Sequence, residues 1–278
     1  MKSLYFYFLL ILISFLTGCS QPQSTVKSSN PKYLRIMGSE TLMPVTQKLA
    51  AEYMQLHPDI SVHVLGGGTT TGVKAITEGQ AEICAASRPL KPEEVKIIAG
   101  KYNSVGLSYM VAKDALSIYV HPLNPVKSLT TEQVRGLFLG EILNWKEVGG
   151  NDSPVEVFVR PPNSGTYLYF KEHILFNESQ ATGTLIVPTS QALATVISKT
   201  VNGIGYGGIS HMQGVRNLNI NGIEPTEENV KNDRYPITRY LFFYVVDTPK
   251  DPTEPFINWV QSPAGQKIVQ EAGFISLW

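Results

Sequence analysis

One short pattern constrains the fold of this chain more than any other feature: a β-prone run, a turn of small polar residues, and then a helix. It occurs three times, at residues 33–56, 60–79 and 155–176. In the first instance YLRIM precedes GSET and then LMPVTQKLAAEYMQL, whose apolar residues recur at helical spacing. Strands that alternate with helices build sheets covered by helices. We therefore predict an α/β protein.

The rest of the chain continues this alternation. The runs AEICAAS, ALSIYVH, GIGYGGI and YLFFYVV predict strands, and the segments between and after them predict helices. About 245 residues follow residue 32, which is near the upper limit for one hydrophobic core. We therefore expect two lobes.

The N-terminal region has the order of features typical of an export signal. Lys2 precedes an apolar run at residues 4–16, and LTGC ends at Cys19. We predict a lipoprotein signal peptide at 1–18, lipidation of Cys19, and a flexible tether at 19–32 that is rich in Ser, Gln, Pro and Lys. An ordinary signal or a buried helix is the alternative. The protein is then extracytoplasmic and lipid-anchored to the cell membrane, in a periplasm or at the cell surface.

Composition narrows the choice of partners. Lys plus Arg and Asp plus Glu are 23 each, so the net charge is zero and favours neither nucleic acid nor another polyanion. Cys84 is the only cysteine after Cys19, so no intrachain disulfide is expected, and its apolar surroundings favour packing. The 5 histidines are scattered without metal-ligand spacing, so we expect no metal and no cofactor.

The small polar turns are candidate anion sites. The first N–H groups of a helix have no partner within it, and the helix dipole adds positive charge there. One turn also has a cation, because Arg160 lies four residues before Ser164-Gly-Thr. Capping of the helix alone remains the alternative for each turn. Ser164 is not in a G-x-S-x-G motif, but a secreted phosphoester hydrolase with a Ser164 nucleophile and His211 also remains an alternative.

Several motifs taken in order resemble one family. IMGSETLMP, GGGTTTGVKAI, AEICAASRPL, NWKEVGG, VRPPNSGTY and NINGIEPTEENVKNDRYPITRYLFFYV are similar to segments of the phosphate-binding proteins of bacterial ABC importers. The resemblance implies a two-lobed, type II periplasmic-binding-protein-like fold with a ligand cleft between the lobes. Lobe 1 would comprise residues 33–115 and 236–278, and lobe 2 residues 116–235, with crossing strands near ALSIYV and RYPITRY.

The resemblance also implies a function. The protein would be a monomeric receptor, not an enzyme, that binds inorganic phosphate and delivers it to ABC permease membrane subunits. A receptor or sensor for another oxyanion, such as sulfate or molybdate, is the alternative. Arg160 would give the ligand a forked pair of donors. The implied ligand-binding set is Ser39, Thr41, Leu42 through its backbone N–H, Thr69, Thr70, Thr71, Ser87, Arg160, Ser164, Gly165 and Thr166.

Two positions depart from the family pattern, and both join the candidate site. One branch of the family has an aspartate after the serine that corresponds to Ser87, whereas this chain has Arg88. Arg88 would be either a second cation for the ligand or half of a salt bridge at the rim. Glu40 stands where many relatives have threonine. It would either accept the ligand's proton, in place of the missing aspartate, or simply complement the helix dipole.

Overall fold

The computed structural model describes residues 32–211 and 213–278. The predicted signal peptide, Cys19 and all of the tether except Lys32 lie outside the described residues, so these predictions remain untested. Within the described ranges, no helix is both long enough and apolar enough to cross a membrane.

The described residues alternate between strands and helices as expected. The strands are β1 (Lys32–Gly38), β2 (Ile60–Gly67), β3 (Ile83–Ala86), β4 (Leu107–Val120), β5 (Ser128–Leu129), β6 (Glu156–Val159), β7 (Leu185–Ile186), β8 (Gly203–Gly208), β9 (Arg216–Asn217), β10 (Asn219–Ile220) and β11 (Thr238–Val245). The α-helices are α2 (Met43–Leu56), α3 (Thr69–Glu78), α4 (Pro92–Tyr102), α5 (Thr131–Leu139), α6 (Gly165–His173), α7 (Ser190–Ile197), α8 (Glu227–Lys231), α9 (Thr253–Gln261) and α10 (Pro263–Glu271). Two 3₁₀ turns are η1 (Trp145–Val148) and η2 (Ile209–His211).

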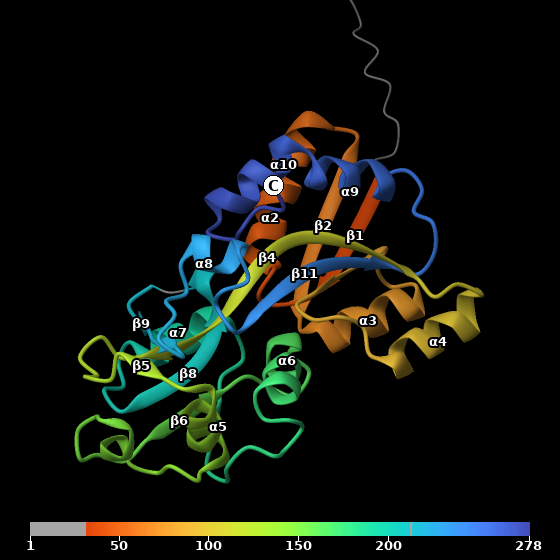
Figure 1. The fold of residues 1–278 in the computed structure, drawn as a ribbon. Helices are drawn as coiled ribbons and strands as arrows, with labels where there is room; N and C mark the ends of the chain where they lie inside the picture. The colour runs from red at the N-terminus through yellow and green to blue at the C-terminus, as the bar shows by residue number, and fades with distance from the viewer. Residues whose placement is uncertain (1–31, 212) are drawn as a thin grey trace, which may run out of the picture. The chain divides into compact units, whose positions relative to one another are not determined.

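A curved sheet of nine strands runs through the molecule (Figure 1). Its order is β2-β1-β3-β11-β4-β8-β6-β7, with β9 on β4, and β5 and β10 form a separate pair. The long strand β4 pairs with β11 as far as Ala115 and with β8 from Leu116 onward. It therefore connects the two ends of the sheet, where the sequence predicts a crossing.

Two hydrophobic clusters meet along β4. Val111 and Ala112 pack with α2, α9 and α10, whereas Ala115 and Leu116 pack with α5, α6 and β8. Helices α3 and α4 cover the other face of β3, around Cys84 and Ile98. Cys84 is buried, so it contributes to packing as predicted. The limits of the two lobes stay predictions.

Helix α3 begins earlier than the sequence suggests. The predicted helix starts at Val73, but the first helical residue is Thr69, which follows Gly68 at a φ of 91°. Such a positive φ favours glycine. Gly79 ends the helix in the left-handed conformation, as predicted. The three threonines therefore form the first turn of α3 rather than a loop before it.

Candidate anion-binding site

Four helices begin around one point of the sheet. Thr41 Oγ1, just before α2, lies 2.9 Å from Thr166 Oγ1 in the first turn of α6 and 3.4 Å from Ser190 Oγ at the start of α7. The start of α3 joins them, because a Cβ added to Gly165 would lie 2.2 Å from Thr69 Oγ1. The positive ends of four helix dipoles are therefore directed at one small region.

Arg160 provides the charge of this region. It follows β6 and is only 1% exposed. Its Nη1 donates to Ser190 Oγ at 2.6 Å and its Nη2 to the Pro188 carbonyl at 2.9 Å, while Nε has no hydrogen-bond partner. Burial lowers the pKa of Arg160 to about 10, so the folded protein disfavours the charged form.

Arg160 differs from the other buried arginines in its lack of a carboxylate. Arg88 forms a two-pronged salt bridge with Glu94, and Arg239 forms one with Asp114. Among the described residues, no carboxylate accepts a hydrogen bond from Arg160. Buried charges are paired in folded proteins, so a buried guanidinium with no carboxylate hydrogen-bonded to it indicates that an anion completes it.

The hydroxyl groups of the site are oriented as donors. Thr69 Oγ1 accepts from the Ser87 N–H at 3.1 Å, and Ser39 Oγ accepts from the Thr41 N–H at 3.2 Å. Ser164 Oγ accepts from the Tyr167 N–H at 3.4 Å and caps α6. A hydroxyl that accepts from a fixed N–H has its own hydrogen left for another acceptor. These three side chains can each donate to an oxyanion.

Glu40 lines the same cavity as Arg160. The cavity has a volume of about 250 Å³, and Gly67, Gly68 and Ser164 also line it. Glu40 is half-buried, and its Oε1 accepts a hydrogen bond from the Gly67 N–H. It is the one acidic side chain on the cavity wall among the described residues, so a protonated ligand oxygen has a carboxylate to donate to.

Four of the expected residues have side chains that face other partners or solvent. The Leu42 side chain is in the hydrophobic core, but the donor expected there is its backbone N–H, which lies 3.4 Å from Ser39 Oγ, so that prediction stays untested. Thr70 is exposed. Thr71 Oγ1 donates to the Gly67 carbonyl at 2.7 Å. Arg88 has the salt-bridge geometry that the sequence left as one of two alternatives, with both terminal nitrogens on Glu94 at 2.7 and 2.8 Å. We therefore leave Arg88 out of the proposed ligand set.

The sequence reasoning missed several buried polar residues beside the site. Ser190 contacts both Arg160 and Thr41, and it follows β7 and Thr189, a fourth instance of the strand, polar turn and helix pattern. Asp114 and Arg239 lie within mainly apolar strands, and each is less than 5% exposed. A charge inside an apolar strand was the signal that could have indicated them.

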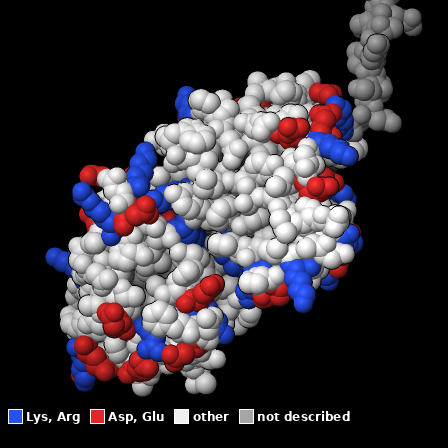
Figure 2. Space-filling view, turned by 45° about the vertical axis from the view of Figure 1, so that its right-hand side comes forward, with Lys and Arg blue, Asp and Glu red and all other residues white. Residues whose placement is uncertain are grey.

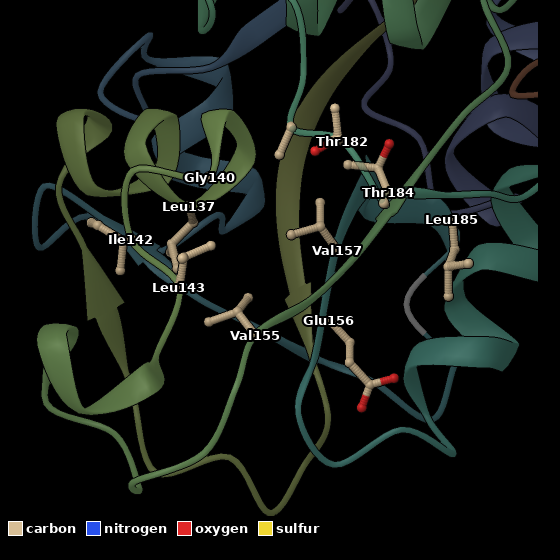
Figure 3. Close-up of a pocket in the computed structure, with 12 residues that line it drawn as sticks. Leu137, Gly140, Ile142, Leu143, Val155, Glu156, Val157, Thr182, Thr184 and Leu185 are labelled. Atoms are coloured by element: carbon tan, nitrogen blue, oxygen red, sulfur yellow. The ribbon is translucent and has the colours of Figure 1, made fainter.

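Other surfaces offer less to an anion. A second cavity, of about 210 Å³, is lined mainly by apolar side chains such as Leu137 and Val157, and Glu156 is its only charged residue among those described (Figure 3). Acidic and basic side chains are interspersed over the face shown in Figure 2.

Within residues 32–211 and 213–278, no cluster of three His, Cys, Asp or Glu side chains could hold a metal ion.

Fold and site together have the features of a binding protein for a small anion, with helix starts and a buried arginine that has no carboxylate bonded to it gathered at one place. The family model of the PBP superfamily domain matches residues 25–264. The phosphate-binding protein PstS of Pseudomonas aeruginosa is 33% identical over 88% of this chain and 83% of its own. PstS of Bacillus subtilis is 30% identical over 87% of this chain and 80% of its own. The chain belongs to the PBP superfamily, in the PstS family of phosphate-binding proteins.

Solved structures agree with this assignment. A protein from Clostridium perfringens, described as a putative phosphate ABC transporter substrate-binding protein with bound phosphate, has a TM-score of 0.83 and 31% identity over 89% of this chain and all (100%) of its own. An ABC-type phosphate transport receptor from Vibrio cholerae has a TM-score of 0.74 and 30% identity, over 87% of this chain and 99% of its own. The predicted α/β, periplasmic-binding-protein-like fold is therefore confirmed.

Proposed function

We propose that this chain is an extracytoplasmic receptor that binds inorganic phosphate beside Arg160 and delivers it to the membrane subunits of an ABC importer. The observation that carries the proposal is the buried guanidinium without a carboxylate, surrounded by the starts of α2, α3, α6 and α7. The names of the relatives from Pseudomonas aeruginosa and Clostridium perfringens support phosphate as the anion. The proposed ligand groups are Ser39, Glu40, Thr41, Thr69, Ser87, Arg160, Ser164, Gly165 and Thr166.

The electrostatics of Arg160 favour a bound anion. A fall in pKa from 12.5 to about 10 corresponds to about 3 kcal/mol of lost interaction for the charged form. An oxyanion that accepts from Arg160 restores that interaction. Charge-assisted hydrogen bonds contribute about 1.5 to 3 kcal/mol each, so a few of them suffice for micromolar affinity, which is about −8 kcal/mol.

We propose binding without covalent chemistry. Ser164 Oγ caps its own helix, and His211 Nε2 lies 3.2 Å from the Thr41 carbonyl, so the hydrolase alternative has no base on its nucleophile among the described residues. Burial also lowers the pKa of His211, which keeps the imidazole neutral. Anchoring through a lipid on Cys19 and a monomeric state complete the proposal.

A thermal-shift panel tests the function. We expect phosphate and arsenate to raise the melting temperature of the mature protein in a concentration-dependent way, because a ligand of the folded state alone stabilises by mass action. Sulfate and molybdate should have much smaller effects. A protein that responds to sulfate or molybdate but not to phosphate would be a receptor for another oxyanion, and one indifferent to all four anions would contradict the proposal.

Glu40→Gln tests the basis of phosphate selectivity. Near neutral pH phosphate keeps a proton that sulfate lacks, and in our proposal Glu40 accepts a hydrogen bond from that protonated oxygen while repelling sulfate. We expect the variant to lower the ratio of phosphate affinity to sulfate affinity about tenfold, the effect of about 1.4 kcal/mol. Calorimetry with both anions measures the ratio. An unchanged ratio would leave Glu40 as a helix-start carboxylate only.

A further inference from the structure

A buried ion pair lies directly behind the anion site. Asp114 of β4 and Arg239 of β11 face each other in the register of the two strands, which run side by side in Figure 1. Arg239 Nε and Nη2 both donate to Asp114 Oδ2, at 3.0 and 2.8 Å. The side chains are 1% and 0% exposed. The carboxylate balances this guanidinium, so Arg239 adds little net charge for the anion.

The remaining nitrogen of Arg239 reaches the site itself. Nη1 donates to Thr166 Oγ1 at 3.0 Å and to the Ser87 carbonyl at 3.3 Å. The guanidinium also lies 5.8 Å from the centre of the Tyr169 ring. Asp114, the ring and two acceptors therefore fix its plane. One side chain thus joins the end of β3 to the first turn of α6.

This contact determines what Thr166 can do. A hydroxyl has one hydrogen to donate, and Thr166 Oγ1 already accepts from a cation. Its hydrogen therefore points away from Arg239, and it is available either to Thr41 Oγ1 at 2.9 Å or, when Thr41 is the donor of that bond, to a ligand. Without Arg239, the Thr166 hydroxyl could rotate and present a lone pair to the ligand, which an anion would repel.

We propose that Arg239, held by Asp114, is a positioning residue for anion binding: it orients the Thr166 hydroxyl as a donor to the ligand and ties the α6 turn to Ser87. The proposal rests on the proposed function and adds to it residues that do not touch the ligand. The alternative is a purely structural ion pair, whose loss would lower the stability of the protein and would not act on binding through Thr166.

A double-mutant cycle separates these two roles. Phosphate dissociation constants are measured by calorimetry for the wild type, Arg239→Lys, Thr166→Val and the double variant. Lysine keeps the charge beside Asp114 but has a single nitrogen, so it cannot also hold Thr166. Loss of one charge-assisted hydrogen bond corresponds to about a tenfold change or more. We expect Arg239→Lys to weaken binding about tenfold alone and less than about threefold in the Thr166→Val background, because the hydroxyl that Arg239 orients is then absent.

Controls keep the test decisive. Arg35→Lys is the matched control, since Arg35 also holds a carboxylate, Glu82, through Nε and Nη2, but on β1 away from the site. It should leave phosphate binding unchanged. If Arg239→Lys does not fold, the neutral pair Asp114→Asn with Arg239→Gln takes its place in the cycle.

The outcomes also separate this inference from the proposed function. Equal losses in the presence and absence of the Thr166 hydroxyl would overturn the positioning role, even though the wild type binds phosphate. A wild type that binds another oxyanion of the panel would overturn phosphate as ligand, and the same cycle with that anion would still test Arg239. A wild type that binds none of the anions would overturn both.

Discussion

Arg160→Met is expected to abolish measurable phosphate binding without lowering the melting temperature of the ligand-free protein. The arginine is 1% exposed, and burial lowers its pKa, so the empty site disfavours its charged form. Methionine removes that charge and fills similar space, which offsets the lost bonds to Ser190 and Pro188. Calorimetry and a thermal melt measure the two effects.

The combination of lost phosphate affinity and unchanged stability makes this result specific to a ligand-binding role. Substitution of a residue with a structural role would lower the stability of the protein. Substitution of a buried, ligand-binding cation that has no carboxylate bonded to it would leave the stability unchanged or raise it. Arg234→Met is the matched control, because the Arg234 side chain is 64% exposed and lies outside the site. It should leave phosphate affinity unchanged. Micromolar binding retained by Arg160→Met would remove Arg160 from the site.

Gly165→Ala should weaken phosphate binding about a hundredfold, the equivalent of two lost charge-assisted hydrogen bonds. A Cβ at this position would lie 2.2 Å from Thr69 Oγ1 and 2.5 Å from Ser87 Oγ. Both atoms belong to short, buried side chains, so the turn that contains Ser164 and Thr166 must move away from α3. The donors could then no longer surround one ion.

The control for this steric effect is another helical glycine. Gly100 in α4 has no atom within 4 Å of an added Cβ, so Gly100→Ala should leave phosphate affinity unchanged and slightly favour the helix. Gly165→Ala should melt somewhat below the wild type without phosphate, because the displaced turn costs stability, and should also lose most of the phosphate-dependent rise. Wild-type affinity in Gly165→Ala would show that α3 and α6 need not approach for binding.

Local patterns predicted the elements of this fold because each was encoded within a few residues. Pro44 lies in the first turn of α2, as its fixed φ allows, and Gly79 ends α3. Arg160 and Ser164 were indicated by their spacing before a helix. Their burial confirms that they lie inside the protein, while their contacts with a ligand stay a proposal.

Contacts between distant residues could not be predicted in this way. Asp114 and Arg239 are separated by 125 positions, and only the pairing of β4 with β11 places them together. Arg88 was ambiguous for a related reason. The sequence shows a cation after Ser87, but its role depends on Glu94, which turns back in the first turn of α4 to accept from it. Burial and partner, not residue type, decide such roles.

The most direct test of the central claim is a crystal structure of the mature protein grown with arsenate, whose anomalous signal locates the ion. We predict one tetrahedral ion within hydrogen-bond distance of Arg160 and of the Thr41 and Thr166 hydroxyls. An ion bound elsewhere on the protein, or a space beside Arg160 that holds only water at saturating arsenate, would contradict the account.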